Sequence, residues 1–125
     1  MTEKIVDLHQ IQEAVERAWS TDTAYGDWTP DVPSLNQCAV TALIVQDLFG
    51  GQLLRCEMSD GDSHYWNRLP SGVQLDLSTP QFEHTEAQPL RETVIIRERD
   101  YVLSFPETEK RYKLLRQRTL EGMNA

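Results

Sequence analysis

Apolar residues near the start of the chain recur every three or four positions, which is the spacing of one face of an α-helix. They are Leu8, Ile11, Val15, Ala18 and Trp19. The pattern predicts an amphipathic helix over residues 7–19. Asp7 stands where a helix N-cap is expected, because its side chain can accept a hydrogen bond from a free backbone N–H of the first turn.

A second helix is predicted from the run "NQCAVTALIVQDLFGG", which is almost wholly apolar over residues 39–49. An apolar run without a polar face is typical of a buried helix, here from about residue 37 to residue 49. The two glycines that follow suit a helix C-cap. Residues 21–37 hold two prolines and predict an irregular loop that crosses to the helix.

After the glycines the pattern changes from helical to extended, and short turn signals separate the extended segments. Strands are predicted at "QLLRCEM" (52–58), "SHYWNRL" (63–69), "VQLDLS" (73–78) and around residues 93–96. The short links favour antiparallel neighbours. A last helix is predicted to begin near Pro106, since proline suits the first helical position. The layout predicts one α+β domain over residues 1–125.

Composition narrows the class of protein. The 125 residues carry a net charge of −8, which argues against nucleic acid as a partner. No apolar run is long enough to span a membrane, and residues 1–10 lack the pattern of a signal peptide. With two cysteines and no export signal, we expect a cytoplasmic protein. The basic stretch "EKRYKLLRQR" is interpreted as a solvated helix end that complements the acidic body, with a docking patch as the alternative.

The candidate chemistry centres on Cys38, at the start of the buried helix. A helix N-terminus favours negative charge and therefore the thiolate form of a cysteine. A thiol nucleophile also needs a base, and the base needs a group that orients it. His64 in the second predicted strand and Asp76 near the end of the third are the candidates for these roles.

The turn between these two strands decides whether His64 and Asp76 meet. With residues 69–71 as a three-residue turn, the two residues pair directly. With residues 70–72 they are diagonal neighbours, still on one face of the sheet. A two-residue turn would put them on opposite faces. The three-residue turns also place Val73, Leu75 and Leu77 together on the other face, as a core.

The segments "NQCAVTALIVQDLFGG", "SHYWNRL" and "VQLDLSTPQF" resemble the Cys, His and Asp motifs of the transglutaminase-like and papain-like superfamily. Over most of its length the chain also resembles the YunG-type family of small bacterial proteins. The resemblance implies a papain-like or transglutaminase-like core. Carried over residue by residue, it implies Cys38 as nucleophile, His64 as base and Asp76 as orienting carboxylate.

The chain departs from the transglutaminase pattern at Asn36, where those enzymes have glycine. Asn tolerates a positive φ better than most residues, so we expect the same turn to form. The backbone N–H of Cys38 is the expected oxyanion donor, with Gln37 or Trp28 as candidate second donors. Trp28 and Trp66 are also candidates for lining a substrate cleft, although packing is the commoner role of such aromatics.

Other readings of the same residues remain open. Cys56 alternates with apolar neighbours and is interpreted as a core residue, and a disulfide with Cys38 is disfavoured in a reducing compartment. A zinc site from Cys38, Cys56, His64 and His84 lacks any recognised ligand spacing, so no metal is expected. His84 itself lies in a polar segment and is interpreted as solvated.

The expected function is cysteine-dependent acyl transfer on a peptide, a protein or a small amide, without a cofactor. Peptidase, amidase, deamidase and transglutaminase activities all fit. Glu57, Asp60 and Asp62 near the histidine strand are interpreted as solvated, with recognition of a cationic substrate as the alternative. The rival hypothesis is a papain-like binding or regulatory module without turnover, which has no need of a reactive thiol.

Overall fold

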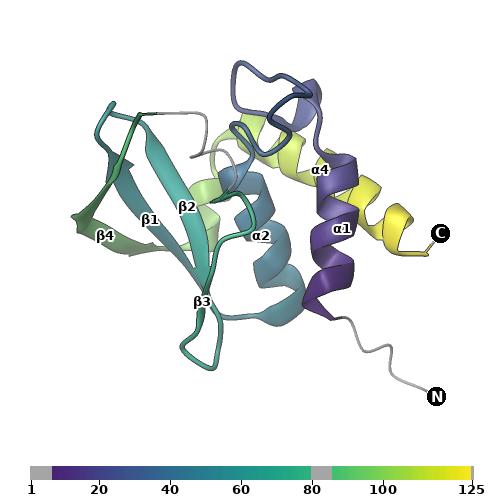
Figure 1. The fold of residues 1–125 in the computed structure, drawn as a ribbon. Helices are drawn as coiled ribbons and strands as arrows, with labels where there is room; N and C mark the ends of the chain where they lie inside the picture. Colours follow the sequence, from purple (N-terminus) through teal and green to yellow (C-terminus); the bar gives the residue numbers. More distant parts are fainter. Residues whose placement is uncertain (1–6, 80–85, 125) are drawn as a thin grey trace.

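The computed structural model describes residues 7–79 and 86–124 of the chain. It has an α+β fold in which a small antiparallel sheet lies on one side and the helices on the other (Figure 1). Helix α2 (Cys38–Phe49) lies between the sheet and the two outer helices, α1 (Leu8–Ala18) and α4 (Pro106–Asn124). This central position confirms the predicted buried helix.

The first helix begins as predicted. Asp7 is the N-cap of α1, and its carboxylate accepts a hydrogen bond from the backbone N–H of Gln10 at 2.8 Å. The Gln10 side chain accepts in return from the backbone N–H of Asp7, which completes a capping box. The buried side of α1 consists of Ile11, Ala14, Val15 and Ala18. The helix therefore turns its apolar face into the core and packs against α4. The indole N–H of Trp19, just after the helix, donates to Thr41 of α2 at 2.9 Å.

Helix α2 supplies the centre of the core. Its buried residues are Val40, Thr41, Ala42, Leu43, Ile44 and Val45. The helix ends at Gly50, whose φ of 75° is the left-handed conformation that favours glycine at a C-cap. The loop before α2 contains one short 3-10 helix, η1 (Thr21–Thr23), which the prolines of that segment did not indicate.

The sheet has the strand order β3-β2-β1-β4, and all of its pairs are antiparallel. Strands β1 (Gln52–Met58) and β2 (Ser63–Arg68) match their predicted segments closely. Strand β3 is only Gln74–Leu75, shorter than the predicted 73–78. The expected core on its far face also fails in part, because the side chain of Val73 is 60% exposed while Leu77 is buried.

Strand β4 (Pro89–Arg97) is longer than predicted and is interrupted where it pairs with β1. Arg55 lies opposite Ile95, but Glu57, two residues further along β1, lies opposite Leu90. Residues 91–94 of β4 therefore leave the regular ladder. The Thr93 hydroxyl accepts the hydrogen bond of the Glu57 backbone N–H at 2.8 Å, so the interruption is satisfied by a side chain.

The chain ends in two helices, of which only α4 was predicted. Helix α3 (Arg99–Leu103) is five residues long and too short to leave a periodic pattern in the sequence. Asp47 of α2 holds the two helices in place: it pairs with Arg99 at 2.6 Å and accepts a hydrogen bond from the Tyr112 hydroxyl.

The basic residues of α4 mostly face partners in the same chain. Arg116 lies 3.5 Å from Asp47, Lys113 pairs with Glu109 at 3.0 Å, and the Arg111 guanidinium lies over the Tyr25 ring. These contacts favour the interpretation of this stretch as cations that complement the acidic body.

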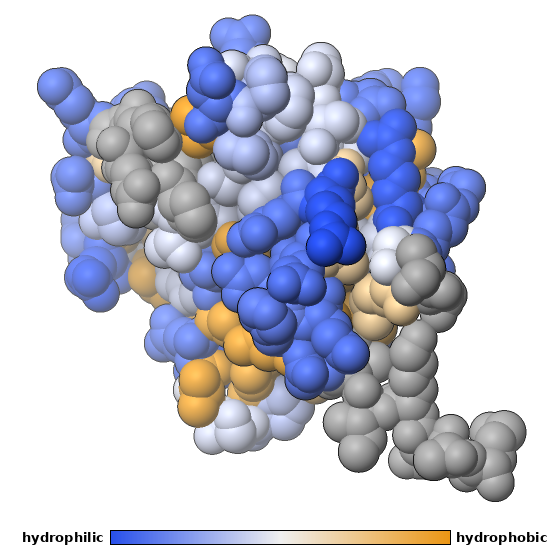
Figure 2. All heavy atoms as spheres, turned by 45° about the vertical axis from the view of Figure 1, so that its right-hand side comes forward, coloured by the Kyte–Doolittle hydropathy of each residue, from blue (hydrophilic) through white to orange (hydrophobic). Residues whose placement is uncertain are grey.

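Hydrophilic side chains cover most of the face shown in Figure 2, with small apolar areas between them. Large exposed apolar side chains are found on β4 and just after it, at Val94, Ile95, Ile96, Tyr101 and Phe105. Within the described ranges no helix has both the length and the apolar character needed to cross a membrane.

Candidate active site

The fold brings Cys38, His64 and Asp76 together. Nε2 of His64 lies 2.5 Å from Oδ2 of Asp76, and the imidazole also shares a hydrogen bond with the Cys38 side chain. The three residues come from the start of α2, from β2 and from the segment just after β3. One imidazole therefore links a thiol to a carboxylate.

The register of β2 and β3 explains how His64 reaches Asp76. Asn67 lies opposite Leu75, and the turn between the strands is residues 70–72, closed by a hydrogen bond from the Leu69 N–H to the Val73 carbonyl at 2.8 Å. This is the second of the two three-residue turns considered from the sequence, the one that makes His64 and Asp76 diagonal neighbours. The predicted pairing of the two side chains is confirmed. The prediction that Asp76 lies within a strand is wrong, because β3 ends at the preceding residue.

Asp76 is held by residues that follow it. Its Oδ1 accepts hydrogen bonds from both the backbone N–H and the hydroxyl of Ser78, each at 3.0 Å. A side chain that bonds its own backbone two residues on competes with the strand ladder, which accounts for the early end of β3. The arrangement leaves Oδ2 for His64. Both carboxylate oxygens of Asp76 are therefore occupied, and its orientation is fixed.

His64 is buried, with 5% of its surface exposed. Burial lowers the pKa of the imidazole, but hydrogen bonds to Asp76 and Cys38, with the charge of both groups, outweigh it and raise the pKa to about 9. The imidazolium form is therefore favoured across neutral pH. An imidazolium beside a thiol is the electrostatic arrangement that stabilises a thiolate.

Cys38 is the first residue of α2 and is half-buried, with a free thiol. The chain enters the helix through Asn36, which has a φ of 58° and is the one non-glycine residue with positive φ in the described part of the chain. This confirms the expectation that Asn36 adopts a positive φ in the turn before the helix. The Asn36 amide donates to the Asp27 carbonyl at 2.7 Å and so fixes the turn to the preceding loop.

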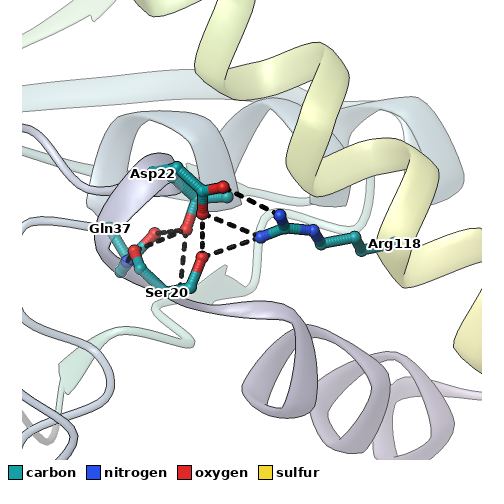
Figure 3. Close-up of polar contacts among 5 residues, drawn as sticks. Ser20, Asp22, Gln37 and Arg118 are labelled. Atoms are coloured by element: carbon teal, nitrogen blue, oxygen red, sulfur yellow. Dashed lines mark hydrogen bonds and ion pairs between the residues drawn. The ribbon is translucent and has the colours of Figure 1, made fainter.

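The side-chain amide of Gln37, a candidate oxyanion donor, is bonded to the loop that precedes α2. Its side chain is fully buried, accepts a hydrogen bond from the Thr23 hydroxyl at 2.9 Å and donates to the Ser20 carbonyl at 3.0 Å. Figure 3 shows this amide inside a group of polar side chains that ends at Arg118 of α4. We therefore assign Gln37 a supporting role in place of the predicted oxyanion role.

Arg118 closes that polar group from the far end of the chain. Its guanidinium forms two hydrogen bonds with Asp22, at 2.9 and 2.8 Å, and a third with the Ser20 hydroxyl at 2.7 Å. These bonds hold the pKa of Asp22 well below its usual range. The last helix thus fastens the loop that leads into Cys38.

The indole of Trp28 is also hydrogen-bonded within the loop before α2. Its indole N–H donates to the Pro33 carbonyl at 2.9 Å, so this donor is not available to an oxyanion. Trp66, in contrast, lies beside the site: its ring stacks on that of His64, with centroids 5.6 Å apart and an interplanar angle of 16°. Its N–H donates to the Gln74 side chain at 2.9 Å. The prediction that Trp66 borders the site therefore agrees with its position.

A hollow of about 490 Å³ opens beside His64 and Trp66. It is lined by Cys56, His64, Trp66, Gln74, Leu75, Asp76, Thr79, Pro89, Arg91 and Val94. Cys38 is outside this lining and is linked to the hollow through His64. The acidic residues Glu57, Asp60 and Asp62 are also outside it, so they do not favour a cationic ligand there.

Cys56 lies directly opposite His64 in the β1–β2 pair and is fully buried, as predicted. Burial raises the pKa of its thiol, which keeps the thiol neutral. His84 of the rejected zinc set lies outside the described residues. Among the residues that are described, no group of three or more His, Cys, Asp or Glu side chains is arranged to hold a metal ion.

Two supporting residues were missed from the sequence. Asn67 is buried and donates from its side chain to the Ala42 carbonyl at 2.9 Å, which ties the histidine strand to the cysteine helix. Ser78 orients Asp76 as described above. Both stood within the quoted motifs, and a buried polar residue in a strand next to a candidate histidine is the signal that could have identified Asn67.

Comparison with known proteins shows the family. The model of the YunG protein family matches residues 7–124, and the chain belongs to this family. The uncharacterized protein YunG of Bacillus subtilis (strain 168) is 33% identical to it over 76 residues, which are 61% of this chain. The match spans 64% of that relative's length. No solved structure matches the chain.

Proposed function

We propose that the protein is a cysteine-dependent acyl-transfer enzyme that acts on an amide or ester carbonyl. The observation that carries the proposal is the His64 imidazole, which bonds Asp76 on one hand and Cys38 on the other. A nucleophile, a base within hydrogen-bond reach and a group that orients the base are the three parts that covalent catalysis requires. The order helix, strand, strand of these residues and their resemblance to the transglutaminase-like and papain-like motifs support the same proposal.

In this proposal each residue has one task. The Cys38 thiolate attacks the carbonyl carbon, and the backbone N–H at the helix start faces the oxyanion that forms. The His64 imidazolium gives its proton to the leaving amine or alcohol as the bond to the carbonyl carbon breaks, which leaves a thioester on Cys38. Asp76 holds the ring in place through both steps. Water or an amine then attacks the thioester, His64 takes its proton, and Cys38 leaves as the thiolate.

The test is acylation by an activated ester. Incubation with p-nitrophenyl acetate is expected to release a burst of one nitrophenolate per chain and to leave one acetyl group on Cys38, located by mass spectrometry of peptides. Cys38→Ala abolishes the burst and His64→Ala slows it. Cys56→Ala is the matched control, because its buried thiol takes no part: the burst persists, while loss of the small buried group lowers the free energy of unfolding by about 1–3 kcal/mol.

The rival hypothesis of a binding module predicts a different outcome. If folded protein is not acylated at Cys38, or if Cys38 and Cys56 are acylated equally slowly, the triad geometry serves structure or binding and the proposed function is wrong.

A further inference from the structure

The hollow beside His64 offers hydrogen-bond donors from Arg91 and Gln74, although the protein as a whole is acidic. We infer that it is a subsite for a carboxylate, and that the substrate is a small amide or ester that carries a carboxylate near the group to be transferred. The naming of the ligand as a substrate rests on the proposed function. The binding of a carboxylate does not.

Arg91 brings a positive charge to the hollow. It lines the hollow from β4, is exposed, and has no carboxylate partner in the described part of the chain. Most other arginines of the sheet and helices have partners; Arg99 and Arg118, for example, each form an ion pair of 2.8 Å or less. A guanidinium that is not satisfied within the fold can take up a carboxylate through two parallel hydrogen bonds.

Arg91 lies in the irregular part of β4. Residues 91–94 leave the β1–β4 ladder, and Thr93 replaces the missing backbone partner of Glu57. The segment that departs from the ladder contains both Arg91 and Val94, which line the hollow. Interruptions of this kind re-aim side chains and are common next to active sites. The irregular segment of β4 thus contributes a cation and an apolar side chain to the lining of the hollow.

The remaining polar groups of the lining point to the same ligand. The Asp76 carboxylate already accepts from His64 and Ser78, and the Thr79 hydroxyl donates to the Asp76 carbonyl at 2.7 Å. The Gln74 oxygen accepts from Trp66, which leaves the Gln74 NH₂ without an acceptor among the described residues. The side-chain groups available to a ligand are therefore donors, from Arg91 and Gln74. Donors of this kind match an anion and not a lysine or arginine side chain.

Size and shape limit the ligand further. A volume of about 490 Å³ lies within the range of about 300–1,000 Å³ typical of sites for small molecules. One guanidinium and one neutral amide suit a singly charged carboxylate. Trp66, Leu75 and Val94 supply an aromatic and aliphatic wall for an apolar group next to it. We therefore expect a small N-acyl amino acid or a related compound in preference to a folded protein.

The experiment compares two probes that differ only in the carboxylate. Hippurate has an aromatic ring, an amide and a carboxylate, and hippuramide replaces the carboxylate by a neutral amide. Each is titrated into ¹⁵N-labelled protein while the indole N–H signal of Trp66 is followed by NMR. Hippurate is expected to bind about tenfold more tightly than hippuramide, as one charge-assisted pair allows. Arg91→Gln brings the two affinities within about twofold of each other, because Arg91 supplies the charge.

Lys110→Gln is the matched control, since it removes one positive charge from an exposed position on α4 and should leave the preference for hippurate unchanged. Equal binding of the two probes to the wild type, no binding of hippurate at millimolar concentration, or an unchanged preference in Arg91→Gln would each overturn the inference.

The same titration with Cys38→Ala separates this inference from the proposed function. Hippurate should bind this variant as it binds the wild type, because Cys38 is outside the lining. If hippurate binds in the way described but Cys38 is not acylated by p-nitrophenyl acetate, the carboxylate subsite stands and the acyl-transfer proposal fails. If Cys38 is acylated but the probes bind equally, the acyl-transfer proposal stands and the substrate class is wrong.

Discussion

His64 and Asp76 are bonded at 2.5 Å although Asp76 lies just beyond the short strand that would have aligned it. The bond is secured from both sides. The turn at residues 70–72 sets the register, and Ser78 holds the second carboxylate oxygen of Asp76. The pair therefore depends on local hydrogen bonds after β3 more than on a long ladder, and it can be tested by changes that leave the sheet intact.

Asp76→Asn removes the charge of this carboxylate but keeps its size. The pKa of His64 should fall, because the hydrogen bond to a charged Asp76 is a main cause of its elevation. Acylation of Cys38 by p-nitrophenyl acetate should slow by at least about tenfold, since the ring loses its orientation and its imidazolium is less favoured. The His64 pKa is measured by NMR titration and the burst by nitrophenolate absorbance. Asp60→Asn, in the exposed turn between β1 and β2, should change neither. An unchanged pKa in Asp76→Asn would show that the pair does not set the protonation of His64.

The raised pKa of His64 makes stability depend on pH. The pKa rises from 6.5 to about 9 on folding, so the folded state holds a proton that the unfolded state has lost in this window. The stabilisation from His64 is fully present below about pH 6.5 and is lost as the pH rises through about 9. Between these values the free energy of unfolding should fall by about 1.4 kcal/mol per pH unit from this group.

Urea unfolding at several pH values in this range, for the wild type and for His64→Gln, measures the effect. The difference between the two proteins should shrink as the pH rises. A difference that is constant or grows with pH would mean that His64 is not held as an imidazolium.

The sequence was sufficient to predict the parts of the fold that depend on local chemistry. The N-cap at Asp7, the buried run that forms α2 and the positive φ at Asn36 follow from residue preferences that act over a few positions. The contact between His64 and Asp76 followed from the length of the turn, because a turn with an odd number of residues, here three, keeps both on one face of the sheet.

Other features depend on contacts between distant segments and left no local signal. One of the two neighbours of β1 is β4, some forty residues further on. The side chain of Thr93 satisfies the interruption of their ladder between Arg55 and Glu57. The hydrogen bonds of Gln37 left no signal in the sequence for the same reason, because its partners Thr23 and Ser20 are set by the path of the crossing loop. Arg118 joins that group from 96 residues away.

Arg118 offers a test of how the loop before α2 is held. Arg118→Gln removes the two hydrogen bonds to Asp22 seen in Figure 3. Because the pair is partly exposed, the free energy of unfolding should fall by only about 0.5–1 kcal/mol. The larger effect should be local. The side-chain amide protons of Gln37 should exchange with solvent faster, since the loop that holds Ser20 and Thr23 is no longer bonded to α4. Hydrogen exchange by NMR measures this. Lys113→Gln, in a pair within α4, is the control and should leave the exchange at Gln37 unchanged. Equal exchange rates in the two variants would show that Arg118 does not support the loop.

The most direct test of the account is the pH dependence of Cys38 alkylation by iodoacetamide, followed separately at Cys38 and Cys56 by peptide mass spectrometry. The reactive species is the thiolate, and a neighbouring imidazolium and a helix N-terminus are both environments that favour a reactive cysteine. We expect Cys38 of the wild type to be alkylated at about pH 6 at least about tenfold faster than buried Cys56, and His64→Ala to lose most of this rate while keeping its fold. If wild type and His64→Ala react at Cys38 with the same rate and the same pH profile, His64 does not activate the thiol and the proposed Cys-His-Asp site is wrong.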